Sequence, residues 1–503
     1  MRAIMIQGTA SDVGKSVLCT ALCRIFYEDG IRVAPFKSQN MALNSYVTQD
    51  GREIGRAQGV QAEAAGVIAT VDMNPILLKP KGSGLSEVIV HGKRLKDVNY
   101  HSYRGSFHEV ALRSIQESID RLKQQFDLLV VEGAGSPAEV NLNDREVVNM
   151  RIARMLDAPV LLVTDIDRGG AFASLVGTLE LLEPEDRRRV KGMIINKFRG
   201  AYDLLEPGIR WLEEKTGIPV VGVIPFVEHS IEAEDSLALG SLELKKGDVS
   251  PWDLDIAVIE IPFISNFTDL DPLRQEPGVH LRFVRSRKEF GRPHLVILPG
   301  SKNSIEDLKW LYQTGIGEQI LHAYQNGAWV VGICGGYQML GRELIDPLHV
   351  ESNEDRLQGL GLLDTTTTYI PTKTTVRRTA MVVHGPCAGE DVEGFEIHLG
   401  QTERGKDVAP FLQYDNVYDG AVSPCGRVTG TYLHHIFHNR RFTRRFLNHI
   451  RQTFGLSPVD EQLISDQELR EREYTRIAAH VRKHLDMDAI YQLIVTDKFS
   501  SQE

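Results

Sequence analysis

Residues 8–16 read Gly-Thr-Ala-Ser-Asp-Val-Gly-Lys-Ser, and this stretch decides the fold of the N-terminal half. It follows a short apolar run, Ala3–Ile6, and precedes the helical apolar pattern of Val17–Phe26. A glycine-containing loop between a buried strand and the start of a helix directs backbone N–H groups at an anion. The order of strand, loop and helix therefore predicts a phosphate-binding loop near the N-terminus.

The loop supplies the first candidate residues for binding ATP and a magnesium ion. Lys15 would neutralise the charge of the β- and γ-phosphates, and the hydroxyl of Ser16 would ligate Mg²⁺. Asp12 acts on the acceptor or on the metal, or it is a turn residue, and the sequence does not separate these roles. The full set is Gly8, Thr9, Asp12, Gly14, Lys15 and Ser16.

Three further polar residues follow apolar runs in this half, where open α/β sheets place their ligands. Glu132 ends the run Phe126–Val131 and offers Mg²⁺ the hard oxygen ligand that it prefers. The alternative for Glu132 is a surface or helix-capping carboxylate. Lys37 follows another apolar run and is either a second phosphate ligand or a solvated lysine. Asn196 follows the run Gly192–Ile195.

A second chemical signal lies at residues 328–341, which read Ala-Trp-Val-Val-Gly-Ile-Cys-Gly-Gly-Tyr-Gln-Met-Leu-Gly. An apolar strand ends at Cys334, small residues follow, and a helix begins. Such a turn exposes the sulfur, and the positive end of the helix favours the thiolate. We therefore predict that Cys334 is a nucleophile.

A thiol nucleophile needs a base and a site for the developing oxyanion. His434 follows the predicted strand Val428–Leu433 and is the candidate base, although a lone histidine after a strand is more often structural. A glycine loop at Gly300 follows the predicted strand His294–Leu298.

The apolar runs predict two doubly wound α/β domains. Continuous apolar strands separated by helix-length segments are typical of parallel sheets that are covered on both faces. We expect an ATP-binding α/β domain at 1–228, a linker at 229–251, a second α/β domain at 252–445 and a helical tail at 446–503. The predicted strands are Ala3–Ile6, Phe126–Val131, Pro159–Thr164, Gly192–Ile195, Pro219–Ile224, Asp255–Ile261, His294–Leu298, Ala328–Ile333, Thr365–Val383 and Val428–Leu433.

Composition narrows the class of protein. A net charge of −11 disfavours the phosphate backbone of nucleic acid, so we expect no nucleic-acid partner. Five cysteines in 503 residues do not form a disulfide framework. The N-terminus lacks a secretory h-region, and no apolar run has membrane-spanning length, so we expect a cytoplasmic protein without a membrane partner. The sequence leaves the oligomeric state open, with a homo-oligomer as one candidate.

Both motifs resemble known families. The phosphate loop is one residue longer than the standard spacing and, with Glu132-Gly133-Ala134-Gly135, resembles the dethiobiotin synthetase family, which phosphorylates carboxylates. Asn196 with Lys197 resembles the element that reads the nucleotide base in related P-loop folds. The segment around Cys334, the loop of Gly300 and the string Gly-Thr-Tyr-Leu-His at 430–434 resemble class I glutamine amidotransferases. That resemblance implies a Cys334–His434 glutaminase with glutamine as substrate, and it assigns the oxyanion site to the loop of Gly300.

The match to class I amidotransferases departs from the family at one position. Most members carry a glutamate two residues after the histidine, whereas position 436 is Ile. Glu396 is a candidate substitute or a substrate contact, and we leave both alternatives open. His435 stands where the cobalamin-pathway branch more often has Gly, so which of the two histidines faces the sulfur also stays open.

Over nearly its whole length the chain resembles the glutamine-hydrolysing cobyric acid synthase family. The distinctive strings are 7–16, 37–45 and 55–58, and the resemblance places 39–45 in the acceptor pocket. It implies ATP- and Mg²⁺-dependent amidation of the b, d, e and g carboxylates of adenosylcobyrinic acid a,c-diamide, a corrinoid. The nearest rival is cobyrinic acid a,c-diamide synthase, which usually carries an Asp-rich string where this chain has Ser38-Gln39-Asn40. The rival from another class is a non-catalytic P-loop ATPase.

Overall fold

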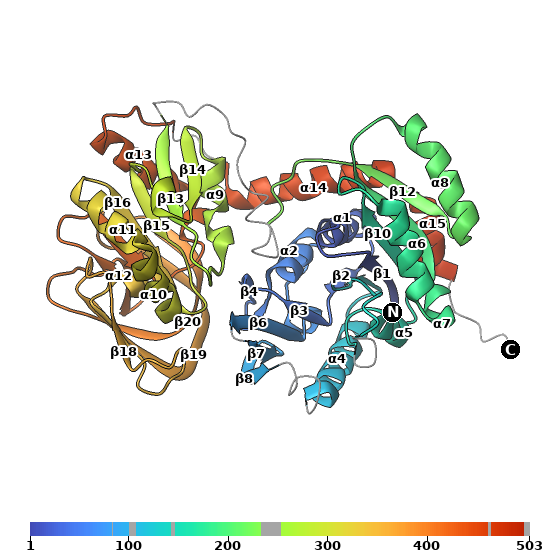
Figure 1. The fold of residues 1–503 in the computed structure, drawn as a ribbon, viewed down its shortest axis with the longest axis horizontal. Coiled ribbons are helices and arrows are strands. Elements are labelled where there is room, and N and C mark those ends of the chain that lie inside the picture. The colour runs from blue at the N-terminus through green and yellow to red at the C-terminus, as the bar shows by residue number, and fades with distance from the viewer. Residues whose placement is uncertain (83, 100–106, 142–145, 233–252, 461–463, 497–503) are drawn as a thin grey trace. The chain divides into compact units, whose positions relative to one another are not determined.

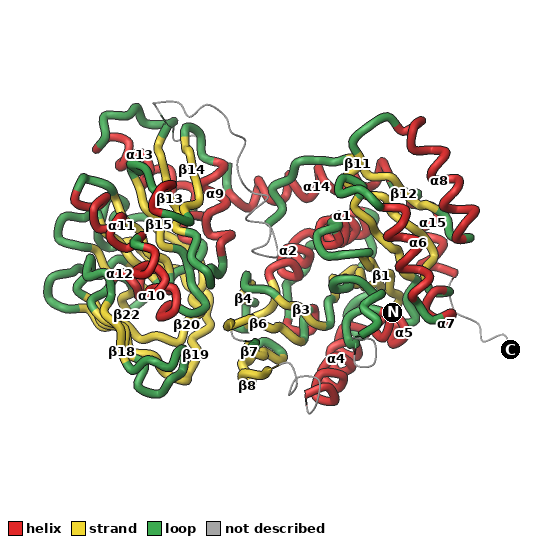
Figure 2. The backbone as a smooth tube through the Cα atoms, in the orientation of Figure 1, coloured by secondary structure: helices red, strands yellow, loops and turns green. Residues whose placement is uncertain are grey.

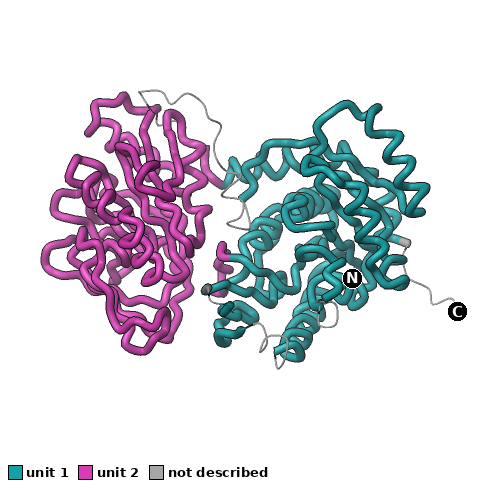
Figure 3. Tube along the Cα trace, viewed as in Figure 1, with its two compact units in different colours: residues 1–42, 53–232, 467–503 teal, residues 43–52, 233–466 magenta. Residues whose placement is uncertain are grey.

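The computed structural model describes residues 1–82, 84–99, 107–141, 146–232, 253–460 and 464–496. The chain divides into two compact units (Figure 3). Unit 1 comprises Met1–Ala42, Glu53–Glu232 and Gln467–Glu503, and unit 2 comprises Leu43–Arg52 and Ala233–Asp466.

Unit 1 is built on a six-stranded sheet of order β12-β11-β10-β1-β9-β2 (Figure 1). All neighbouring strands in it are parallel. The carboxyl ends of β1 and β9 therefore meet at the same edge. The strands are β1 (Arg2–Gly8), β2 (Val33–Phe36), β9 (Leu128–Glu132), β10 (Val160–Asp165), β11 (Val190–Phe198) and β12 (Val220–Pro225).

Helices cover both faces of this sheet (Figure 2). Ile4 and Ile6 of β1 pack in one core cluster with residues of α1 (Lys15–Glu28), α14 (Asp466–His484) and α15 (Met487–Thr496). On the opposite face Ile195 of β11 packs against Leu205 and Ile209. The helices there are α5 (Met150–Leu156), α6 (Ala171–Leu181), α7 (Pro184–Arg187) and α8 (Tyr202–Thr216). The C-terminal helices thus complete the core of the N-terminal unit.

A second sheet in unit 1 has the order β3-β6-β7-β8 and was not expected from the sequence. Its last strand reads Lys-Arg-Leu-Lys-Asp-Val-Asn, and such a polar strand carries little apolar signal. The strands of this sheet are β3 (Gln39–Met41), β6 (Ile76–Gly82), β7 (Leu85–Val90) and β8 (Lys93–Asn99). The other elements of this stretch of the chain are β5 (Glu53–Gly55), α2 (Arg56–Ala64), η1 (Val71–Met73), α4 (His108–Lys123) and β4 (Ser45–Val47), of which β4 belongs to unit 2.

Unit 2 contains a six-stranded sheet of order β14-β13-β15-β16-β24-β23, parallel except at β23. Its strands are β13 (Leu254–Ile259), β14 (Val279–Val284), β15 (Leu295–Leu298), β16 (Trp329–Ile333), β23 (Ala421–Val422) and β24 (Val428–Thr431). The helices are η5 (Phe267–Leu270), α9 (Asp271–Gln275), η6 (Arg287–Glu289), α10 (Ser304–Thr314), α11 (Ile316–Gln325), α12 (Gly335–Leu340), η7 (Ile436–His438) and α13 (Arg440–Thr453). Strand β14 was not predicted.

A second sheet in unit 2 has the order β18-β17-β19-β21-β22, with β20 paired antiparallel to β19. The long strand β19 (Thr365–Val382) corresponds to the predicted Thr- and Val-rich stretch. The other strands are β17 (Glu343–Ile345), β18 (Arg356–Gln358), β20 (Asp391–Arg404), β21 (Leu412–Tyr414) and β22 (Val417–Asp419).

The α/β fold class with two mainly parallel sheets is confirmed, but two expected boundaries need correction. The boundary expected at residue 445 falls inside α13, because Phe446 and Ile450 continue the buried face of that helix. The expected tail at 446–503 is divided, since 467–503 belong to unit 1. Most of the expected linker, 233–251, lies outside the described residues. Among the described residues, no helix is long and apolar enough to cross a membrane.

The packing of α14 on unit 1 gives a stability prediction. Ile477 is fully buried in the sheet core, so Ile477→Ala removes apolar contacts and leaves a cavity. We expect a loss of about 2–5 kcal/mol in the free energy of unfolding, measured in urea. Val495→Ala, at a position that is 61% exposed on α15, is the control. Equal stability of the two variants would contradict this packing.

Candidate functional site

The phosphate loop lies between β1 and α1 in unit 1, in the order that the sequence predicts. Two of its residues have left-handed backbone conformations, Asp12 with φ 58° and Gly14 with φ 97°. A Cβ atom at position 14 would lie 2.3 Å from Nδ2 of Asn196, so only glycine fits there. The loop conformation is therefore fixed by both backbone torsion and close packing.

Neighbouring strand ends hold the loop in place. Asn196 donates from Nδ2 to the carbonyl of Val13 at 2.8 Å, and Lys197 donates from Nζ to the carbonyl of Asp12 at 2.7 Å. Thr9 donates its hydroxyl to Thr164 at 3.2 Å. Asn196, which the sequence suggested for the nucleotide base, here packs against the loop itself.

The side chain of Lys15 folds back over the loop. Its Nζ donates to the carbonyls of Ala10 at 3.0 Å and Gly135 at 3.3 Å. A Cβ atom added to Gly8 would lie 2.9 Å from this Nζ. The ammonium is therefore held between the phosphate loop and the loop after β9, where it can neutralise the negative charge of a bound phosphate.

A buried carboxylate organises the adjoining metal candidate site. Glu132 is 1% exposed and accepts hydrogen bonds on Oε1 from Ser16 Oγ at 2.9 Å and Lys37 Nζ at 3.0 Å. Its Oε2 accepts one from Nε2 of Gln61 at 2.6 Å. The structure thus brings together Ser16, Glu132 and Lys37. Gln61 was missed, because its only sequence signal is a polar residue on a buried helix face.

These groups fit a magnesium ion. A hydroxyl and a carboxylate are hard oxygen ligands, and Mg²⁺ usually takes one or two protein oxygens beside water and phosphate. Ser16 and Glu132 would hold the ion, which would supply charge neutralisation to the phosphates. Among the described residues, no cluster of three or more His, Cys, Asp or Glu side chains forms a metal site.

In unit 2, Cys334 stands at the turn between β16 and α12 with φ 52° and ψ −108°. This left-handed conformation is costly for a non-glycine residue and marks a nucleophile turn. The backbone N–H of Cys334 donates to the carbonyl of Thr431 at 2.8 Å, which ties the turn to β24. A Cβ atom at Gly336 would lie 2.0 Å from the carbonyl oxygen of Leu298, so the turn also packs directly on the end of β15.

The base candidate and the oxyanion candidate are close to one another. His434 is fully buried and follows β24, and a Cβ atom added to Gly300 would lie 3.0 Å from its Cε1. Burial alone lowers the pKa of this imidazole. The charges of Asp269 and Cys334 and hydrogen bonds with both outweigh burial and raise the pKa of His434 to about 10. The structure therefore brings together Cys334, His434 and the loop of Gly300.

A carboxylate contacts His434, although none follows it in the sequence at position 436. Asp269 of η5 lies 2.7 Å from Nδ1 of His434 through Oδ2. Glu396, the substitute suggested by the sequence, instead lies 3.6 Å from Arg378 and 3.5 Å from His398. Asp269 could not be predicted from the sequence around His434, because Asp269 follows β13 whereas His434 follows β24.

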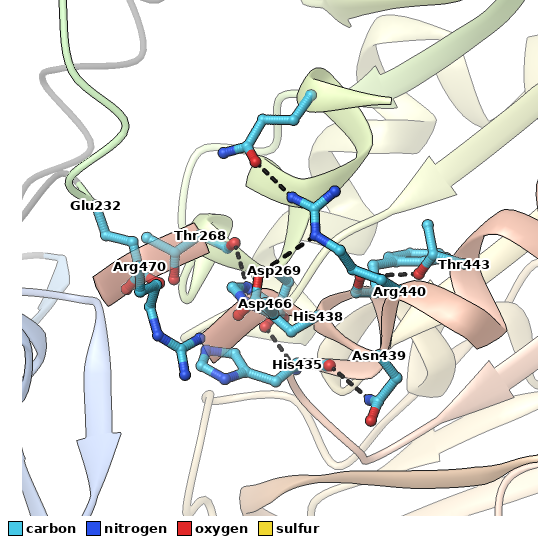
Figure 4. Close-up of polar contacts among 12 residues, drawn as sticks. Glu232, Thr268, Asp269, His435, His438, Asn439, Arg440, Thr443, Asp466 and Arg470 are labelled. Carbon is cyan, nitrogen blue, oxygen red and sulfur yellow. Dashed lines mark hydrogen bonds and ion pairs between the residues drawn. The ribbon is translucent and has the colours of Figure 1, made fainter. Parts of the chain in front are cut away.

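The ring of the second histidine packs against His438. His435 has φ 66°, a conformation that explains a preference for glycine at this position. Its ring stacks on that of His438 with 4.1 Å between centroids, and His438 contacts the carbonyl of Thr268 at 3.0 Å (Figure 4). The backbone N–H of His435 donates to Oδ1 of Asp269. His434 is thus the histidine beside Cys334.

Comparisons with known proteins match both units. A model of the CobB/CobQ-like glutamine amidotransferase domain matches residues 255–442. A model of the CobQ/CobB/MinD/ParA nucleotide binding domain matches residues 4–238. The chain therefore joins a P-loop nucleotide-binding domain to a glutamine amidotransferase domain.

Similar proteins extend over nearly the whole chain. A cobyric acid synthase from Geobacillus sp. (strain WCH70) is 52% identical over 492 residues, which cover 97% of this chain and 96% of that protein. Cobyric acid synthases from Desulforamulus reducens and Streptococcus sanguinis are 50% and 48% identical, covering 98% of this chain and 98% and 99% of those proteins. The chain belongs to the cobyric acid synthase family and is a glutamine-dependent amide ligase.

Proposed function

We propose that the chain uses ATP and glutamine to amidate the b, d, e and g carboxylates of adenosylcobyrinic acid a,c-diamide, giving adenosylcobyric acid. The observation that carries this proposal is the pairing of two chemistries in one chain. A buried Cys334 lies close enough to His434 for its charge to act on the imidazole, and a phosphate loop with Lys15 and Ser16 lies in the other unit. The names of the relatives supply the corrinoid product.

The glutaminase half releases ammonia by thiol chemistry. His434 takes the proton of Cys334, and the thiolate attacks the side-chain amide carbon of glutamine. Backbone N–H groups of the loop at Gly300 stabilise the oxyanion. The imidazolium returns its proton to the departing ammonia, and a water molecule then hydrolyses the thioester to glutamate.

The synthetase half activates the acceptor. Lys15, Lys37 and the loop N–H groups hold the triphosphate, and the acceptor carboxylate takes the γ-phosphoryl group to give an acyl phosphate and ADP. Ammonia attacks that carbonyl, and phosphate leaves. Ammonia in water at neutral pH is mostly protonated and lacks a lone pair. Release of ammonia inside the protein keeps it nucleophilic.

Removing the thiol separates the two half-reactions. We expect Cys334→Ala to abolish glutamine-supported amidation and to keep amidation with ammonium salt, because only the ammonia source is lost. Amide product is measured with each nitrogen source. Cys425→Ala, which removes an exposed thiol, is the matched control and should keep both activities. Equal loss of both activities in Cys334→Ala would contradict the two-site scheme.

Removing the loop lysine tests the ATP site. Lys15→Ala should lose synthesis with glutamine and with ammonium salt alike, because both routes need the activated carboxylate. ADP release and amide formation are measured together. Lys123→Ala, on an exposed part of α4, is the control. Ammonia-dependent synthesis that persists in Lys15→Ala would mean that the loop is not the ATP site.

The substrate is tested by feeding cobyrinic acid and its a,c-diamide separately and following product by mass spectrometry. Each amidation replaces a hydroxyl by an amino group and so changes the mass by a fixed step. We expect successive steps from the a,c-diamide up to adenosylcobyric acid. Amidation of cobyrinic acid that stops at the a,c-diamide would favour the sister activity instead.

A further inference from the structure

We infer that Asp269 is the positioning residue of the glutaminase, completing a Cys334–His434–Asp269 triad whose carboxylate comes from the loop after β13. The inference rests on the proposed Cys–His glutaminase and names the group that makes its base effective. Asp269 takes the place of the glutamate that class I amidotransferases usually carry two residues after the histidine.

The contact has the geometry of an orienting carboxylate. Oδ2 of Asp269 lies 2.7 Å from Nδ1 of His434, and the side chains are 2% and 0% exposed. An ionised carboxylate only accepts hydrogen bonds, so Nδ1 must carry the proton. The lone pair of the neutral ring is then on Nε2, the nitrogen that can take a proton from a thiol. Asp269 therefore fixes the tautomer that a base requires.

Asp269 is itself held by the segment that it orients. Its Oδ1 accepts the backbone N–H of His435 at 2.9 Å, so consecutive residues bind both carboxylate oxygens. The backbone N–H of Asp269 donates to the carbonyl of Asn266 at 3.0 Å, which closes the turn that presents it. Because both oxygens have partners from residues 434 and 435, the carboxylate cannot turn without breaking two buried hydrogen bonds.

The ring of His434 is also fixed on its other sides. Phe395 stacks on it with 5.2 Å between centroids and 20° between planes. Nδ2 of Asn266 lies 3.4 Å from Nε2 of the ring. The Asn266 amide is oriented by the backbone N–H of Ser45, which donates to its Oδ1 at 2.9 Å. These contacts hold the ring in the orientation that Asp269 imposes.

The charge of Asp269 also stabilises the protonated form of His434. Proton transfer from Cys334 creates an imidazolium at a site with no solvent exposure, where an uncompensated charge is strongly unfavourable. The charged groups that act on this ring are Asp269 and Cys334. Asp269 therefore stabilises the charged intermediate state of the base as well as its orientation.

The test uses the nearly isosteric variant Asp269→Asn. We expect kcat for glutamine hydrolysis to fall by about 10²–10⁴-fold, with KM for glutamine unchanged, because the carboxylate acts on the base and does not touch the substrate. Asp269→Glu, which keeps the charge, should recover part of kcat. Ammonia-dependent amidation should stay at the parental rate in both variants.

A thiol assay reports the base directly, without glutamine. The rate of Cys334 alkylation by iodoacetamide at neutral pH should fall in Asp269→Asn, because the imidazolium partner of the thiolate is lost. The assay is made in a Cys425→Ser background, since Cys425 is exposed and its pKa is lowered to about 7, mainly by hydrogen bonds from Ser423 and Tyr324 that outweigh burial. The alkylated residue is identified by peptide mass mapping, because Cys334 is buried, as are Cys19, Cys23 and Cys387.

Asp346→Asn is the matched control, because it makes the same change at another fully buried carboxylate of unit 2, whose oxygens accept the backbone N–H groups of Val350, Glu351 and Ser352. Parental glutaminase activity in Asp346→Asn beside the loss in Asp269→Asn supports the inference. Parental kcat and alkylation in Asp269→Asn, or an equal loss of activity in Asp346→Asn, overturns it. Loss of ammonia-dependent amidation in Asp269→Asn also overturns it, since the effect is then structural. Glutaminase activity that survives in Cys334→Ala would instead refute the proposed function.

Discussion

The left-handed backbone of Cys334 is the constraint on which the glutaminase unit depends. A non-glycine residue in this conformation costs about 1–3 kcal/mol, and surrounding contacts must enforce it. The N–H of Cys334 is tied to Thr431, and the next turn packs on Leu298. Strands β15, β16 and β24 must therefore lie side by side before the turn can form. The same strand order brings the Gly300 loop and His434 to the thiol.

The synthetase unit depends on a comparable arrangement around Glu132. A buried carboxylate is unfavourable unless its oxygens are paired, and Ser16, Lys37 and Gln61 pair them here. Each partner comes from a different element at the same edge of the sheet. The cluster therefore links the phosphate loop to β9 and β2. It also holds negative charge next to the place where a metal and phosphates would bind.

The sequence predicted what is local and missed what is assembled at long range. The strand before Lys15 and the turn at Cys334 were predictable, because their apolar runs and small residues are contiguous. Asp269 was not, because 165 residues separate it from His434 and nothing near position 436 points to it. Its position follows from the pairing of β13 with β15, which no short segment encodes. In the sheet of β3, β6, β7 and β8, the strands β3 and β8 are mainly polar and carry no apolar period that would predict them.

The order of residues in the chain also differs from their grouping in space. Segment 43–52 lies between β3 and β5 in the sequence, and both of those strands belong to unit 1. The segment itself belongs to unit 2, where Val47 packs with Phe395 and Ile397. Its Ser45 fixes the Asn266 amide that faces the ring of His434. A stretch that lies within the nucleotide-binding half in sequence therefore belongs to unit 2 in space, where it contacts the residue beside His434.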